Sequence, residues 1–367
     1  MSARRMSHAI AKAVPFYPAA LFYPIWLFSL ARMDRADTAF AENWPLAVCM
    51  VFGSMIAGAT PLGGGVVAFP ISVLILKLSP SQSRDISILL QSVGMSAASF
   101  LLLTTRPGQV DRDLVMSFLM FGTIGCIIGF SIDVAPRIAT FTYTTIVLHF
   151  SIFLKLRDFR VTSPSRTQSS PARRNSWLAL CALATCAILG GILSATIGSG
   201  IDMAVMVYGT ICNTMMHEYD TLTLVSSSVV AMASISVVCT IIRFTYEPTF
   251  DRRTIDAWFA TVWIVILGAP VGSLLLTPLF KKWLLGAFYV LSVVQFTTFA
   301  VLKIEGDTIL WIAFSAVSVA NALCNRVAIW RHMTHIFVSF RPNEQVVSTH
   351  AGDGDVVRME IGNESCT

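Results

Sequence analysis

The sequence predicts an all-α polytopic membrane protein, and three observations carry this prediction. Hydrophobic residues make up 55% of the chain and charged residues only 13%, whereas soluble domains carry about 25% charged residues. Several apolar runs approach the roughly 20 residues that a helix needs to cross a hydrocarbon core about 30 Å thick. These runs are continuous rather than alternating, which argues for helices and against transmembrane strands.

The apolar runs follow one another along the whole chain. The first, at 14–31, contains Pro15, Pro18 and Pro24 and lacks a clean cleavage site, so we expect a first span rather than a cleaved signal peptide. The other runs of spanning length lie at 85–104, 113–131, 138–154, 220–242, 257–275, 283–302 and 308–325.

Two further pairs of runs are broken by glycine. Residues 44–59 and 66–77 are separated by the segment 60–65, TPLGGG, and residues 177–196 and 201–212 by the segment 197–200, IGSG. Segments of about 10–14 residues are too short to cross a bilayer. We therefore expect each pair to form a short re-entrant hairpin. The alternative is that both members cross the membrane fully, which would leave every loop on the same side.

The two halves of the chain match in spacing. Gly63 and Gln91 are 28 residues apart, as are Gly198 and Ser226, and a later helix in each half carries GxxxG, at Gly125 and at Gly268. This duplication predicts two repeats, each with one glycine-broken hairpin and three spans. Three spans is an odd number, so the second repeat must be inverted relative to the first.

The predicted organisation has six parts. They are an N-terminal tail with the first helix at 1–43, repeat 1 at 44–154, a basic linker at 155–176, repeat 2 at 177–302, a final helix at 303–330 and a polar tail at 331–367. With the linker inside, most Lys and Arg residues lie in inside segments, as the positive-inside rule requires. Both termini are then cytoplasmic.

The glycine breaks are the candidate substrate site. A helix begins directly after each break, and its first N–H groups have no intrahelical partner while its dipole is positive at that end. Such ends bind anions, and discontinuous helices hold substrates in inverted-repeat transporters. The candidate residues are Gly63, Gly64, Gly65, Gly198, Ser199 and Gly200. The alternative is that these glycines only allow helices to cross closely.

Polar side chains follow on the next helix of each half. Gln91 and Ser92 correspond by spacing to Ser226 and Ser227. Their amide and hydroxyl groups could donate hydrogen bonds to an anion, although small polar residues also pack helices in membranes.

Asp202 has two interpretations. With Ser199 it has the S-x-x-D form of a capping box. Alternatively, as an acid within the membrane, it couples transport to protons or to another cation.

No motif supports an enzyme, a cofactor or a metal. The signatures of zinc proteases, serine hydrolases and P-loop nucleotide-binding proteins are missing. Most of the eight cysteines lie in apolar runs and fit small core residues better than a disulfide or zinc framework. The predicted partners are the bilayer and a small anion, with no nucleic acid.

The break segments resemble a known family. The segment 62–70, LGGGVVAFP, is similar to the glycine-triplet and proline signature of the TauE/SafE sulfite exporters, the four-toluenesulfonate uptake permease group, and 197–202, IGSGID, resembles its second copy. The second copy has Ser199 in place of the middle glycine and lacks the proline. The extra span and the long linker suggest a eukaryotic or otherwise divergent member. The resemblance implies transport of sulfite, sulfonates or related sulfur anions.

Three functions are therefore open from the sequence. The first is a secondary transporter of a small anion that works by alternating access between inverted halves. The second is a passive anion channel built on the same helix ends. The third is a membrane scaffold or receptor that does not transport.

Overall fold

The computed structural model describes residues 17–61, 63–132, 177–215 and 219–275, and some residues between 138 and 152 and between 286 and 319. Over these residues the protein is all-α, as predicted. The elements are α2 (Tyr17–Ala31), α3 (Ala36–Ala59), α4 (Gly65–Leu74), α5 (Pro80–Thr105), the 3-10 helix η2 (Pro107–Gln109), α6 (Arg112–Ser131), α8 (Trp177–Ile197), α9 (Ile201–Met215), α10 (Thr221–Tyr246) and α11 (Arg252–Leu274). The predicted linker at 155–176 and the tail at 331–367 lie outside the described residues.

Six of the described helices are long and apolar enough to cross a membrane. They are α3, α5, α6, α8, α10 and α11. The chain is therefore an integral, multi-pass membrane protein.

The first helix of each broken pair is longer than a re-entrant half-helix. We expected a short helix at 44–59, but α3 begins at Ala36 and has 24 residues. Its first turn extends beyond the apolar run, and Asp37 there complements the positive end of the helix dipole. The prediction of two short helices at this break is therefore wrong for its first member. Only the second members are short, with 10 residues in α4 and 15 in α9.

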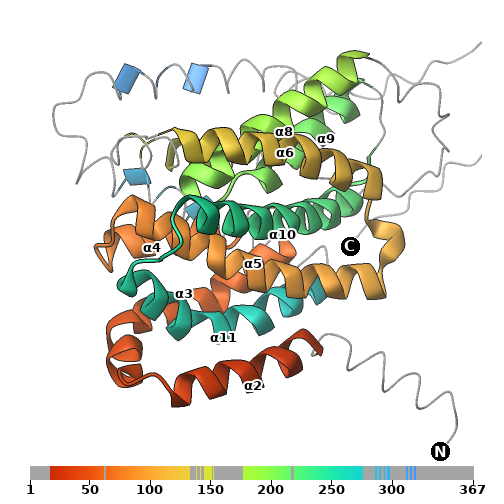
Figure 1. The fold of residues 1–367 in the computed structure, drawn as a ribbon. Coiled ribbons are helices and arrows are strands. Elements are labelled where there is room, and N and C mark those ends of the chain that lie inside the picture. Colours follow the sequence, from red (N-terminus) through yellow and green to blue (C-terminus); the bar gives the residue numbers. More distant parts are fainter. Residues whose placement is uncertain are drawn as a thin grey trace, which may run out of the picture.

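The central helices α5 and α10 pack against each other in opposite directions (Figure 1). Asp85, near the start of α5, pairs with Arg243, near the end of α10. Farther along α5, the Ser99 hydroxyl donates to the Val229 carbonyl of α10 at 3.4 Å. These two helices occupy the same position in the two matched halves of the sequence, so the equivalent helices are antiparallel.

The GxxxG helices pair across the halves. A Cβ atom on Gly125 of α6 would collide with the Ile188 carbonyl of α8, and one on Gly272 of α11 would collide with the Met55 carbonyl of α3. The glycines therefore let each of these helices approach the first helix of the other half at backbone contact, as small residues do in membrane helix pairs. In both halves the GxxxG motif serves close packing.

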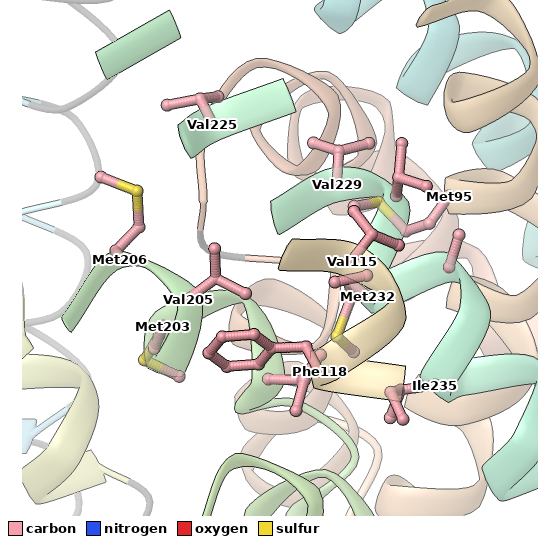
Figure 2. Close-up of a cluster of buried hydrophobic side chains, with 14 of the residues drawn as sticks. Met95, Val115, Phe118, Met203, Val205, Met206, Val225, Val229, Met232 and Ile235 are labelled. Carbon is pink, nitrogen blue, oxygen red and sulfur yellow. The ribbon is translucent and has the colours of Figure 1, made fainter. Parts of the chain in front are cut away.

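A buried apolar cluster surrounds the first turns of α9. Figure 2 shows Met203 of α9 beside Phe118 of α6, with Met232 of α10 nearby, and all three are buried. Unbranched methionine side chains fill irregular gaps between helices that meet at different angles. This packing holds the N-terminal end of α9 against α6 and α10.

Candidate substrate site at the two helix breaks

Each break contains one glycine with a positive φ angle. Gly63 has a φ of 60° and Gly198 a φ of 89°. In this region a side chain clashes with the backbone, so glycine is strongly favoured. The chain can therefore turn sharply at both points. Gly198 directly follows the end of α8 at Ile197, and Gly63 lies two residues before the start of α4.

The Gln91 side chain connects the two breaks. Its amide nitrogen donates to the Gly198 carbonyl at 2.6 Å and to the Ser87 carbonyl of its own helix at 3.1 Å. Both amide hydrogens are therefore engaged. The orientation of the amide is fixed, and Oε1 has to face the opposite direction.

Three buried oxygen atoms converge at Gly63. A Cβ atom on this glycine would lie 2.7 Å from Asp202 Oδ2, 2.8 Å from Gln91 Oε1 and 3.2 Å from Ser199 Oγ. None of these three oxygens has a hydrogen-bond partner in the described part of the chain. All three residues are buried, with at most 1% exposure. Because a Cβ atom so close to these oxygens would force them to shift, only a glycine fits at position 63 without displacing them.

The three glycines of the first break face different surroundings. A Cβ atom on Gly65 would lie 2.8 Å from Gln91 Nε2 and 3.1 Å from the Gly198 carbonyl, so this residue also faces the second break. One on Gly64 would meet Met50 Cε at 3.5 Å and Ala57 Cβ at 3.8 Å, which are ordinary contacts. Gly64 is the N-cap of α4, has a helical φ of −70° and provides no side-chain cap.

The N-terminal end of α9 is engaged by side chains. Ser194 Oγ accepts from the Ile201 N–H at 3.1 Å, and Asp202 Oδ1 accepts from the Met203 N–H at 2.9 Å. Because Ser199 Oγ makes no hydrogen bond, the reciprocal capping box predicted for Ser199 and Asp202 does not form. The two short helices therefore begin differently: α9 carries a carboxylate in its first turn, and α4 carries none.

The other predicted polar residues lie in different surroundings. Ser92 donates to the Leu89 carbonyl of its own helix at 2.9 Å, and Ser227 accepts from the Asp111 N–H at 2.9 Å. Ser226 is fully buried, and its hydroxyl has no partner among the described residues. A Cβ atom on Gly200 would meet Leu193 and the Gly190 carbonyl of its own hairpin. The structure thus brings together Gly63, Gly65, Gln91, Gly198 and Ser199 with Asp202.

Two features of this region were not predicted. Ser194 caps α9 from within α8, seven residues away from Ile201. Asp85 pairs with Arg84 at 2.8 Å and with Arg243 at 3.0 Å. Arg243 is 158 residues from Asp85, so no local pattern could have identified the pair.

Comparisons with known proteins complete the description of the site. The family model "Sulfite exporter TauE/SafE" matches residues 46–306, which include both breaks, five of the six helices of spanning length and residues 46–59 of the sixth, α3. No curated protein matches the chain. No solved structure matches it either.

Proposed function

Because this chain belongs to the sulfite exporter TauE/SafE family, a family of membrane transporters of sulfur-related anions, we propose that it carries sulfite, a sulfonate or a related sulfur oxyanion by alternating access. The observation that carries the proposal is the meeting of the two breaks in the protein interior, where Gln91 of the first half donates to Gly198 of the second.

Of the two short helices, α4 has the N-terminal end that is better suited to binding an anion. Its first N–H groups have no intrahelical carbonyl, its dipole is positive there, and Gly64 adds no side-chain cap. Gly63 and Gly65 let side chains of α5 and of the second break approach the backbone beside it. An oxyanion held by these N–H groups would lie between the halves, where a substrate of an inverted-repeat transporter is expected.

The antiparallel pairing of α5 and α10 supports the inverted repeats. Equivalent helices related by an axis in the membrane plane run in opposite directions, as this pair does. The crossed GxxxG contacts follow the same symmetry, because α6 lies against α8 as α11 lies against α3.

Uptake by the purified protein in proteoliposomes tests the function. Labelled sulfite and a small panel of sulfonates are compared with sulfate, chloride and acetate, and protein-free liposomes are the control. We expect uptake of at least one sulfur oxyanion that saturates with concentration, because a carrier binds one substrate per cycle. Conductance that rises without saturation would indicate a channel. The absence of flux for every sulfur oxyanion from inserted, folded protein would contradict the proposal.

The proposed topology predicts the side of each loop. Tags at the N-terminus, at residue 165 and after residue 341 should be reached from the cytoplasm, and tags near 35 and 248 from the opposite side. The structure supports a common side for 35 and 248, because α3 and α11 begin just after these positions and run in the same direction: Gly268 lies against Ser54, and Ser273 donates to the Gly58 carbonyl. Access to 35 and 165 from the same side would refute the inverted arrangement.

A further inference from the structure

We propose that Arg84 and Arg243 form a second oxyanion site, which the Asp85 carboxylate occupies in this structure. A sulfur oxyanion would take the place of this carboxylate on its way to or from the helix breaks. The passage of the substrate through this site rests on the proposed function, whereas the binding of an anion between the two arginines does not.

Two arginines from different helices hold one carboxylate. Arg84 Nε and Nη2 lie 2.9 and 2.8 Å from Asp85 Oδ1, and Arg243 Nε and Nη2 lie 3.1 and 3.0 Å from Asp85 Oδ2. Each carboxylate oxygen is therefore contacted by two nitrogen atoms of one guanidinium. Arginine binds phosphate oxygens with the same paired N–H groups, and sulfite and sulfonate groups also present neighbouring oxygen atoms. The arrangement suits any small anion of this kind.

The buried part of this cluster carries one positive charge in excess. Arg243 and Asp85 are buried, and the Arg84 side chain is 19% exposed, so two guanidiniums face a single buried carboxylate. The other acidic partner of Arg243 is Glu247, whose side chain is 70% exposed, and solvent screens its charge. A buried charge without a partner is costly, so a second anion that reaches the cluster is attracted to it.

Aromatic rings hold both guanidiniums independently of Asp85. The Arg84 guanidinium carbon lies 5.2 Å from the centre of the Phe130 ring, and that of Arg243 lies 5.2 Å from the centre of the Phe250 ring. These cation–π contacts do not depend on the carboxylate. The two arginines are therefore held in place for an anion that replaces it.

A stripe of polar residues on α5 connects this cluster with the breaks. Ser87 and Gln91 follow Arg84 after three and seven residues, the spacing of one helix face. Gly198 of the second break packs on this face, because a Cβ atom on it would meet Ser87 Cβ and the Arg84 carbonyl. The Ser87 hydroxyl is buried and has no hydrogen-bond partner among the described residues. Once the second break separates from α5, as alternating access requires, this hydroxyl can donate to a passing anion.

The proposed topology places the cluster on the side opposite to the cytoplasm, since Arg243 and Glu247 come just before position 248. Arg84 is the more exposed of the two arginines, so an anion from that side contacts it first. Because one anion replaces another, neither arginine loses its partner during the exchange, which avoids the cost of an unpaired buried charge.

Thermal unfolding of the full chain in detergent tests the anion site without any transport. In Asp85→Ala, the missing carboxylate leaves a place for a small anion between the arginines. Sodium formate and sodium sulfite are each compared with sodium chloride at constant ionic strength. We expect both to raise the Tm of Asp85→Ala saturably and by several degrees more than that of the natural protein, because a ligand that binds only the folded protein stabilises it. The control Glu247→Ala, which lacks only the exposed partner of Arg243, should respond like the natural protein.

Uptake into vesicles with the non-cytoplasmic side outward tests the route. Arg84→Gln leaves the buried pair of Asp85 and Arg243 in place, so it should fold. We expect it to raise the half-saturating concentration of the sulfur oxyanion at least about tenfold, the usual effect of losing a hydrogen bond to a charged group. Arg84→Lys keeps the charge without the paired N–H groups and should be intermediate. Arg252→Gln, which changes an exposed arginine on the same side, should leave this concentration unchanged.

Equal responses of Asp85→Ala and the natural protein to formate would overturn the anion site and leave Asp85 as a structural counter-ion. If Asp85→Ala does not fold in chloride, its folded yield in formate decides, and no recovery there overturns the site as well. An unchanged half-saturating concentration in Arg84→Gln would refute the route while leaving the proposed function intact. A lack of all uptake would refute the proposed function alone, since the Tm comparison needs no transport.

Discussion

Gly63→Ala is expected to reduce transport by at least about a hundredfold in protein that still inserts and folds. The added methyl would lie within 2.8 Å of Asp202 Oδ2 and Gln91 Oε1, so it would push these side chains apart at the meeting of the breaks. The φ of 60° at this position also disfavours alanine, by roughly 1–2 kcal/mol. The effect is measured as the initial rate of sulfur oxyanion uptake per inserted protein.

Gly64→Ala is the matched comparison for this change. It lies one residue away, its φ is helical, and its methyl would meet Met50 and Ala57 at ordinary contact distances. We expect its loss of transport to be at least tenfold smaller than that of Gly63→Ala. Equal rates for Gly63→Ala and the natural protein would show that the close packing at Gly63 is not part of the transport site.

Asp85→Ala is expected to cost about 3–5 kcal/mol of stability, the usual effect of removing one partner from a buried ion pair. Asp85 and Arg243 are both buried and lie 3.0 Å apart, and Arg84 contacts the second carboxylate oxygen at 2.8 Å. Without Asp85, the exposed Glu247 is the acidic partner that remains for the Arg243 charge among the described residues. The free energy of unfolding in mixed micelles measures this loss.

The double variant Asp85→Leu with Arg243→Met should regain most of that stability, because the buried charge of Arg243 is removed together with that of its partner. Glu247→Ala removes a partner of the same arginine whose side chain is 70% exposed, and it should cost at most about 1 kcal/mol. If Asp85→Ala cost no more than Glu247→Ala, the buried pair would not stabilise the packing of α5 against α10.

The sequence was sufficient for the fold class and for the position of the breaks. Long apolar runs and repeated glycines are local signals, and they identified both Gly63 and Gly198 and the order of the helices. Repeat spacing also identified Gln91, since it lies 28 residues after Gly63. The start of α3 was misplaced because its first turns are polar, and apolar length alone could not extend the helix to Ala36.

The composition of the site could not be predicted in the same way. Equal spacing suggested that Gln91 and Ser226 play equal roles, yet only Gln91 is seen to bond across to the other break, to a carbonyl 107 residues away. The three glycines of the first break look alike in the sequence, but the structure separates Gly63 and Gly65 from Gly64. Such differences depend on which neighbour each backbone atom meets after the halves have packed.

The crossed contacts of the GxxxG helices determine which parts of the protein can move together. Because α6 touches α8 through its backbone, and α11 touches α3 in the same way, neither contact can slide without separating closely packed main chains. Any rocking motion would then carry α6 with the second half of the chain and α11 with the first. If the protein rocks in this way, each rigid body would combine helices from both halves of the chain, and the hinge between them would lie along the pair α5 and α10.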